Sequence, residues 1–323
     1  MKSRYVPFVA LVGLLSCGGE AGTPDPHTSV SQASTTNPYV FLVLMENHSA
    51  SQVIGSKDAP YINSLVAAYA SATDYTTTVH PSEPNYIWLE AGSNNTGDIT
   101  FTSDADPSAT NSTNTTQHLA TQLTAAGVTW KSYQEGLDAN TGLCPITSVG
   151  APENYAAKHN PFVFFQDVSG NPPSATNAFC VAHHAPFSQL AADLSAGNVS
   201  SYNFVTPNLC DDMHGAAGCG SKLVKAGDTW LASNLPQMIN WVNAHGGVVL
   251  VVWDEGGGKA ANPPLPFVAV GPHVKAGFAS TLPYSHSSTL KSIEEIFGVG
   301  LLRGAADPAT NDFADLFVSG FFP

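Results

Sequence analysis

The sequence predicts an α/β fold, a three-layer sandwich built on a mostly parallel central sheet. Two nearly continuous apolar runs, residues 39–45 and 247–253, have the composition of strands that are covered on both faces. Strand-like runs alternate with segments whose apolar residues recur at helical spacing, and this βαβα order is typical of parallel sheets with helices on both sides. The 323 residues are enough for one large domain with a sizeable core.

The first half of the chain predicts the following elements in order. Residues 61–69 have a helical pattern, and residues 71–79, rich in Thr and Tyr, indicate a strand. Residues 84–91 predict a short helix, because proline is tolerated in a first helical turn. A helix over 117–126 and a strand over 128–133 follow.

In the second half, a helix is expected over 187–195 and a strand over 201–205. A long helical pattern runs up to His245, in which Pro236 marks a kink or a restart. After the strand at 247–253, the sequence predicts another strand over 266–270 and a helix over 287–297. That last helix starts at a serine cap and stops at Gly298.

The N-terminus has the features of an export signal. Lys2 and Arg4 precede an apolar run over 6–16 that is too short to span a bilayer, and the run ends at Cys17. Residues 1–17 resemble a bacterial lipoprotein signal peptide, in which this cysteine is lipidated; ordinary secretion with cleavage nearby is the alternative. A polar tether over 18–37 and a single domain over 38–323 would follow.

Lipid on Cys17 would anchor the protein to a membrane surface without a spanning helix. The expected location is therefore the bacterial cell envelope, in the periplasm or on the outer-membrane surface. The oligomeric state is left open by the sequence.

The charge balance excludes one class of partner. The chain has 11 Lys and Arg against 25 Asp and Glu, a formal net charge of -14. Affinity for nucleic acid requires clustered cations, so a nucleic-acid binder is not expected. If the substrate is an anion, its charge must be met by a metal, a helix N-terminus or histidines.

Besides Cys17, the chain has Cys144, Cys180, Cys210 and Cys219, an even number that suggests two disulfides in an exported protein. Cys210 to Cys219 would close a short Gly-rich loop and Cys144 to Cys180 a longer one, although four cysteines allow three connectivities. The polar segments 93–116 and 136–182 are expected to be long loops or a cap near one edge of the sheet.

Polar side chains gather where the predicted strands end. They are Glu46, Asn47, His48, His80, Ser82, Asn85, Asp211, Asp212, His214, Asp254, Glu255 and His286. Ligands of parallel sheets bind beyond the carboxyl ends of the strands. The presence of so many polar residues at the predicted strand ends therefore predicts a site at this edge of the sheet.

Ser82 is the natural nucleophile, since it stands between a predicted strand and a short helix whose N-terminus favours negative charge. The alternative is that Ser82 merely caps that helix. The adjacent acids Asp254 and Glu255 follow a buried strand, where a cation or hydrogen bonds must neutralise them. An exposed acidic turn is the other interpretation.

Several motifs together resemble the phosphoesterase family of bacterial and fungal acid phosphatases and phosphatidylcholine-type phospholipases C, within the alkaline phosphatase superfamily. In family order they are Met-Glu-Asn-His-Ser (45–49), His-Pro-Ser-Glu-Pro-Asn-Tyr (80–86), Lys-His-Asn-Pro-Phe (158–162), the stretch 206–214, Trp-Asp-Glu-Gly-Gly (253–257) and Tyr-Ser-His-Ser (284–287). The resemblance covers nearly all of residues 38–300 and implies an alkaline-phosphatase-like fold.

The resemblance also implies roles for these residues. Ser82 matches the phosphorylated nucleophile, and the implied ligands of a divalent metal are Glu46, Asn47, Asp254, Glu255, Ser82 and Asp212. His159, His214 and His286 would contact the phosphoryl group or donate protons, whereas Asn85 and His80 would bind substrate. Zinc, manganese, iron or calcium would suit such ligands.

We therefore expect a metal-dependent phosphoric monoester hydrolase that acts on a small phosphoester through a phosphoserine. The chain ends soon after its last motif, and Ala50-Ser51-Gln52 stands where longer relatives often have Phe-Asp. Both features favour the acid phosphatase branch. The alternatives are a phosphodiesterase or phospholipase C at the membrane surface, and a non-catalytic lipid-anchored binding protein.

Overall fold

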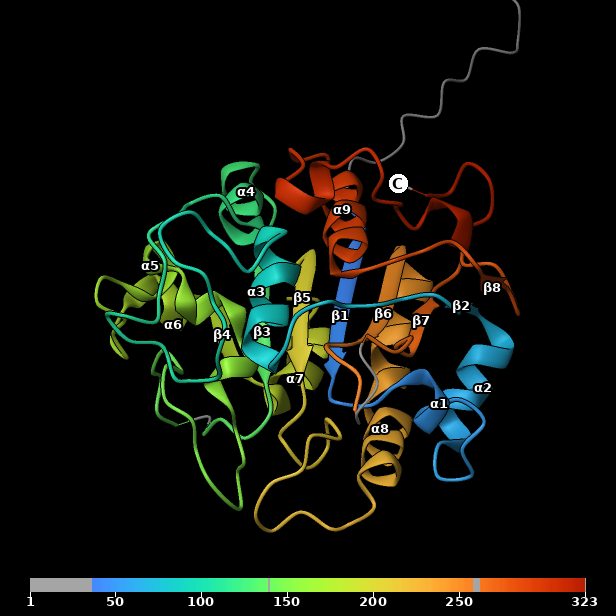
Figure 1. The fold of residues 1–323 in the computed structure, drawn as a ribbon, viewed down its shortest axis with the longest axis horizontal. Coiled ribbons are helices and arrows are strands. Elements are labelled where there is room, and N and C mark those ends of the chain that lie inside the picture. Colours follow the sequence, from blue (N-terminus) through green and yellow to red (C-terminus); the bar gives the residue numbers. More distant parts are fainter. Residues whose placement is uncertain (1–36, 139, 258–261, 323) are drawn as a thin grey trace, which may run out of the picture. The chain divides into compact units, whose positions relative to one another are not determined.

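A central eight-stranded sheet organises the residues described by this computed structural model, which are 37–138, 140–257 and 262–322 (Figure 1). Its strands are β1 (Tyr39–Met45), β2 (Ala70–Ala72), β3 (Trp130–Gln134), β4 (His184–Pro186), β5 (Tyr202–Thr206), β6 (Gly247–Trp253), β7 (Phe267–Val270) and β8 (Ala279–Ser280). The predicted signal peptide, Cys17 and nearly all of the tether lie outside the described residues.

The sheet has the order β4-β3-β5-β1-β6-β7-β2-β8, and β7 runs antiparallel to both its neighbours while the other pairs are parallel. The apolar strands β1 and β6 lie side by side at its centre, in a register that pairs Met45 with Trp253. Both are buried over almost their whole length. The predicted mixed α/β fold with a mostly parallel sheet is therefore confirmed.

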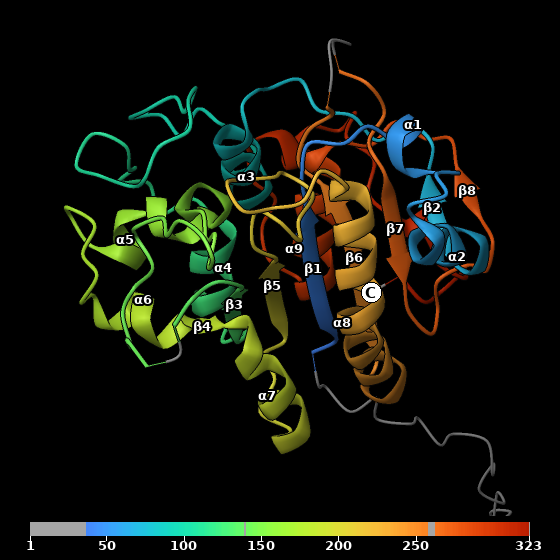
Figure 2. The same ribbon diagram turned by 90° about the horizontal axis from the view of Figure 1, so that it is seen from below.

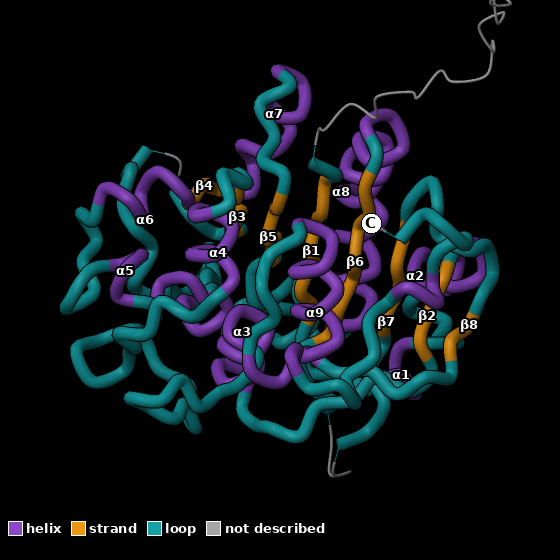
Figure 3. The backbone as a smooth tube through the Cα atoms, turned by 90° about the horizontal axis from the view of Figure 1, so that it is seen from above, coloured by secondary structure: helices purple, strands orange, loops and turns teal. Residues whose placement is uncertain are grey.

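Helices cover both faces of the sheet. They are α1 (Ala50–Val53), α2 (Pro60–Ala68), α3 (Ser82–Ala91), α4 (Leu119–Ala125), α5 (Gln166–Ser169), α6 (Ala178–His183), α7 (Leu190–Ala196), α8 (Leu223–His245) and α9 (His286–Phe297). Helix α8 packs on β1 and β6 and contacts α2 and α7, whereas α3, α4 and α9 contact one another. Views from the two sides place α8 over one face and α3 with α9 over the other (Figures 2 and 3).

Two sequence predictions differ from the structure. The predicted strand over 71–79 stops at Ala72, because the backbone beyond it bonds to loops: Leu265 donates to the Tyr75 carbonyl, and Thr76 donates to that of Tyr284. At Pro236 the alternative of a restart is wrong, because α8 continues from Leu223 to His245 as one helix. Its buried apolar residues lie on both sides of the proline, so packing on the sheet keeps the two halves in one helix.

No helix among the described residues combines the length and apolar character needed to cross a bilayer.

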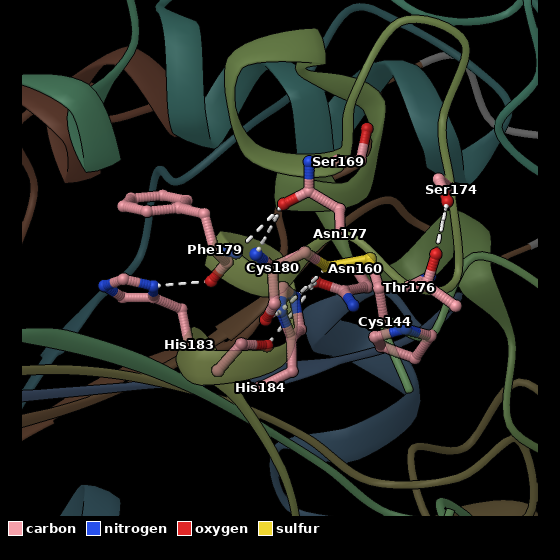
Figure 4. The surroundings of a disulfide bond; sticks show 12 residues. Cys144, Asn160, Ser169, Ser174, Thr176, Asn177, Phe179, Cys180, His183 and His184 are labelled. Atoms are coloured by element: carbon pink, nitrogen blue, oxygen red, sulfur yellow. Dashed lines mark hydrogen bonds between the residues drawn. A yellow bond between two sulfur atoms is a disulfide. The ribbon is translucent and has the colours of Figure 1, made fainter. Parts of the chain in front are cut away.

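The predicted disulfides Cys144–Cys180 and Cys210–Cys219 are both present. The first joins Cys144 to Cys180 of α6, a helix whose first turn is capped by the Asn177 side chain (Figure 4). The Nδ1–H of His184, which follows α6, donates to the Cys180 carbonyl at 2.7 Å, and its Nε2 lies 3.2 Å from the side-chain amide of Asn160. Burial lowers the pKa of His184 to about 4, so the ring stays neutral near pH 7. Through His184, the helix that carries Cys180 therefore contacts Asn160, which directly follows His159.

Removing each disulfide by a double alanine substitution should destabilise the protein by different amounts. The Cys144–Cys180 bridge spans 36 residues and the Cys210–Cys219 bridge spans 9. Chain entropy then gives about 4 kcal/mol for the first and about 3 kcal/mol for the second. Denaturant unfolding of both variants under non-reducing conditions measures the difference. An equal or reversed order of stability would contradict the loop-length argument.

Candidate active site

The ends of β1 and β6 bring the predicted acidic ligands together. Because the two strands are parallel and in register, Glu46 and Asn47 emerge beside Asp254. The N–H of Asn47 donates to Asp254 Oδ1 at 3.1 Å, and that of Asp254 donates to the Met45 carbonyl at 3.0 Å. A Cβ on Gly257 would lie 2.2 Å from the Asn47 carbonyl oxygen, so only glycine permits this approach.

Ser82 is the first residue of α3 and is almost fully buried. Its hydroxyl does not cap the helix but donates to Glu46 Oε2 at 2.9 Å. The loop before it is held by Asn85, whose amide nitrogen donates to the carbonyls of Val79 (3.0 Å) and Pro81 (3.1 Å). The Asn85 side chain, predicted to bind substrate, is thus engaged in shaping the loop that presents Ser82.

His159 connects two of the acids. Its Nε2 lies 3.0 Å from Glu46 Oε1, and its Nδ1 lies 3.2 Å from Asp212 Oδ2. The ring stacks on Tyr86 with centroids 4.9 Å apart and planes inclined by 8°. Asp212 is fully buried and its carbonyl accepts from the Glu46 N–H, so it is this aspartate, rather than the half-buried Asp211, that faces the cluster.

Burial and mutual repulsion make the acids difficult to ionise. The pKa of Glu46 is raised well above its usual range by burial, then by Asp254 and Asp212. Burial, and then the charge of Glu255, raise the pKa of Asp254 to about 7. Burial raises the pKa of Asp212 as well. Three carboxyl groups in one dry region are stable as anions only if a cation neutralises them.

The hydrogen bonding of the cluster fits a metal ion. Several buried polar atoms make no hydrogen bond to any described residue: Glu46 Oε1, Asn47 Oδ1, Asp212 Oδ2, Asp254 Oδ2 and His159 Nε2. His159 Nε2 is close to Glu46, but the pair lacks hydrogen-bond alignment. Glu46, His159 and His214 also offer ligand atoms that lie within 4.8 Å of one another. Carboxylate, amide and imidazole donors suit a divalent cation.

Other predicted site residues are engaged differently. The Glu255 carboxylate pairs with His80 Nδ1, so it is not among the unpaired atoms of the cluster. The Nε2–H of His286 donates to the Asp254 carbonyl at 2.6 Å, and Nδ1 contacts the Tyr75 hydroxyl at 2.8 Å. Burial lowers the pKa of His286 to about 4. His286 therefore positions the end of β6, with both ring nitrogens engaged.

His214 is half-buried and lies beside Glu46 and His159. Its backbone N–H donates to Asp212 Oδ1 at 2.7 Å, and its Nδ1–H donates to the Gly215 carbonyl at 2.8 Å. These contacts turn Nε2 toward the ammonium of Lys158, at 3.1 Å. Burial lowers the pKa of His214.

Lys158 is a residue that the sequence reasoning missed. Its ammonium donates to Asp104 Oδ2 at 2.6 Å, in addition to its contact with His214. Although burial lowers the pKa of Lys158, Asp104 and Glu46 raise it above its ordinary value, so the group is a cation. The available signal was a lysine directly before His159 in a chain with few cations. The sequence reasoning also assigned no role to Tyr75, which contacts His286, or to Tyr86, which stacks on His159. Nothing in the sequence around either tyrosine indicated such a role.

A buried hydroxyl thus faces an acidic cluster at the carboxyl edge of the sheet, where parallel sheets bind their ligands. The chain belongs to the Phosphoesterase family, which it matches over residues 44–300. The prediction of an enzyme that hydrolyses phosphoric esters is confirmed at the level of this family.

Two relatives are similar to this chain in sequence. The phosphatidylinositol-3-phosphatase of Mycobacterium tuberculosis is 31% identical over 319 residues, which are 97% of this chain and 96% of that protein. The phosphate-repressible acid phosphatase of Penicillium chrysogenum is 26% identical over 235 residues, 70% of this chain and 52% of that protein.

Among solved structures, the phosphonate monoester hydrolase SpPMH from Silicibacter pomeroyi is similar, with a TM-score of 0.54 at 11% identity over 87% of this chain and 76% of that one. A likeness at this identity concerns the fold alone.

Proposed function

We propose that the protein is a metal-dependent phosphoric monoester hydrolase that works through a phosphoserine on Ser82. The observation that carries the proposal is the hydrogen bond from Ser82 Oγ to Glu46, inside a set of buried ligand atoms without partners. The two relatives support a monoester substrate, since both are named as phosphatases.

Glu46, Asn47, His159, Asp212 and Asp254 would hold the metal, because they supply the unpaired buried atoms. When bound, the metal supplies positive charge that stabilises an anionic Ser82 oxygen and the phosphoryl oxygens. His214 is assigned a different role, because the Lys158 ammonium faces the lone pair that a metal would need.

The reaction begins when Ser82 Oγ attacks phosphorus and the bond from phosphorus to the alcohol oxygen breaks. The Ser82 proton passes along its hydrogen bond to Glu46 Oε2. The departing oxygen takes a proton from the Lys158 ammonium, since both nitrogens of His286 are engaged. His214 positions that ammonium through the lone pair of its Nε2. Water then displaces Ser82 from phosphorus and returns a proton to Lys158, while Ser82 regains its own proton from Glu46.

Monoester and diester substrates test the proposal. We expect kcat/KM for an aryl phosphate to exceed that for the aryl methyl diester with the same leaving group by about 100-fold or more, since the larger charge of the monoester would be met by the bound metal and Lys158. Mass spectrometry after acid quench should find phosphate on Ser82. A faster diester would favour the phosphodiesterase alternative, and absence of turnover with any divalent metal would favour the binding protein.

We also propose that the protein is exported and lipid-anchored at Cys17. The two disulfides support export, because such bonds persist in oxidising compartments. The mass of the mature N-terminal peptide checks the anchor: an unmodified or absent Cys17 would contradict it.

A further inference from the structure

A cavity of about 380 Å³ lies beside Lys158, and the mechanism above does not use it. It is open to solvent on one side and is lined by chain segments 104–106, 148–158 and 209–217. Most of its wall is apolar or backbone, from residues that include Val149, Ala151, Leu209 and Ala216. We refer to it as the Lys158 cavity.

The Lys158 cavity begins next to the reacting centre. Lys158 lines it and contacts His214 Nε2 at 3.1 Å. Asp104, which pairs with Lys158 in the lining, also accepts from the N–H of Glu83 at 3.0 Å, and Glu83 directly follows Ser82. A group attached to a phosphoryl unit at Ser82 therefore has this cavity within reach, next to the proposed proton donor.

The walls are cross-linked, so the cavity is a built feature of the fold. Ser148 donates to Asp106, and its Oγ accepts from the N–H of Ala157 at 2.9 Å. The N–H of Leu209 donates to the Asn154 carbonyl at 3.0 Å. The Cys210–Cys219 disulfide closes the loop that carries Ala216. That loop also carries Asp212 and His214, so one segment shapes both the cavity and the reacting centre.

The charges of the cavity indicate what it accepts. Its acids are already paired, Asp104 with Lys158 and Asp106 with Ser148, so neither requires a cation from a ligand. Lys158 is the one Lys or Arg side chain in the lining, against two carboxylates. A second anionic group on the substrate would meet this negative wall without a free cation, whereas carbon surface would bury against the apolar residues.

We propose that the Lys158 cavity receives the alcohol part of the phosphoester and that it selects an uncharged, largely apolar leaving group. This inference rests on the proposed phosphoserine chemistry at Ser82. Lys158 stands at the junction, with its ammonium toward the phosphoryl group and its stem along the cavity.

The test compares three aryl phosphates on the metal-loaded enzyme: phenyl, 2-naphthyl and 4-carboxyphenyl phosphate. Wild type should favour both uncharged esters over the carboxylate by at least about tenfold in kcat/KM, the scale of one repulsive contact. Ala216→Phe should fill the cavity and lower kcat/KM for the naphthyl ester at least about tenfold more than for the phenyl ester. Inhibition by inorganic phosphate, which has no leaving group, should stay unchanged.

Ala192→Phe, on the exposed side of α7, is the matched control and should alter no ratio. Val149→Trp at the exposed rim provides a second filling variant if Ala216→Phe does not fold. Equal effects of the filling variant on both esters, or a wild type that favours the carboxylate, would overturn the proposal. Failure of wild type to hydrolyse any of the esters would instead overturn the proposed function.

Discussion

Ser82→Ala is expected to lower kcat by roughly 10⁴-fold or more, the scale of loss when a catalytic nucleophile is removed. The hydroxyl of Ser82 is the buried hydroxyl that donates directly to Glu46, at 2.9 Å. Without it, water alone could attack phosphorus, and the two-step route through a covalent intermediate would be lost. Steady-state kinetics with an aryl phosphate, together with mass spectrometry for phosphoserine, measures the effect.

The fold should survive this substitution. Ser82 does not cap α3, and its side chain contributes one hydrogen bond, worth about 1 kcal/mol. Ser233→Ala, on the exposed side of α8, is the matched control and should leave kcat unchanged. A Ser82→Ala protein that keeps a large share of wild-type turnover would show that another atom attacks phosphorus.

Glu46→Gln is expected to remove metal binding and, with it, activity. Glu46 is fully buried and contacts both Ser82 and His159. In wild type, a metal at about 100 times its Kd should stabilise the fold by about 2.7 kcal/mol, because it binds the folded state alone. In the variant this stabilisation should largely disappear. Unfolding at increasing metal concentration, with metal analysis of the purified proteins, measures both effects.

The metal-free proteins should show the opposite order of stability. Replacing Glu46 with a neutral amide relieves repulsion among buried carboxylates, so metal-free Glu46→Gln should be at least as stable as metal-free wild type. Glu153→Gln, at an exposed carboxylate, is the control and should resemble wild type in both states. A variant that retains the full metal-induced stabilisation would place the metal elsewhere.

The same cluster gives metal-free wild type a pH dependence. Folding raises the pKa of Asp254 from 3.8 to about 7, so between these values the folded state holds a proton that the unfolded state has lost. Stability of the metal-free protein should therefore be greatest below this range and fall as pH rises through it. Bound metal should remove the fall, since it replaces the proton.

Much of the site followed from the strand ends, because parallel strands in register deliver consecutive residues to one edge. Glu46, Asn47 and Asp254 follow the two most apolar strands, and these strands are neighbours. The direction of each side chain beyond the strand was not predictable. Glu255 turns to His80, and His286 turns to the Asp254 carbonyl, because contacts from distant segments fix them.

The element from 71 to 79 illustrates the same limit. Its Thr and Tyr residues favour a strand locally, yet only Ala70–Ala72 pairs in the sheet. The following backbone bonds to segments near residues 265 and 284, far along the chain, and this loop brings Tyr75 to His286. Partners so distant in sequence leave no periodic signal in the segment itself.

Local burial and periodicity were enough to predict the alternation of strands and helices, the apolar centre of the sheet and the polar residues at its edge, although the short strands β4 and β8 and the helices α5 and α6 were not predicted. Only the tertiary structure decided which polar atoms find partners and which do not. It left a set of buried ligand atoms unpaired around Glu46 and placed the Lys158 ammonium against His214. Both outcomes depend on contacts between loops that are far apart in the sequence. Packing between these loops sets the position of each polar atom, and the local sequence pattern does not contain this information.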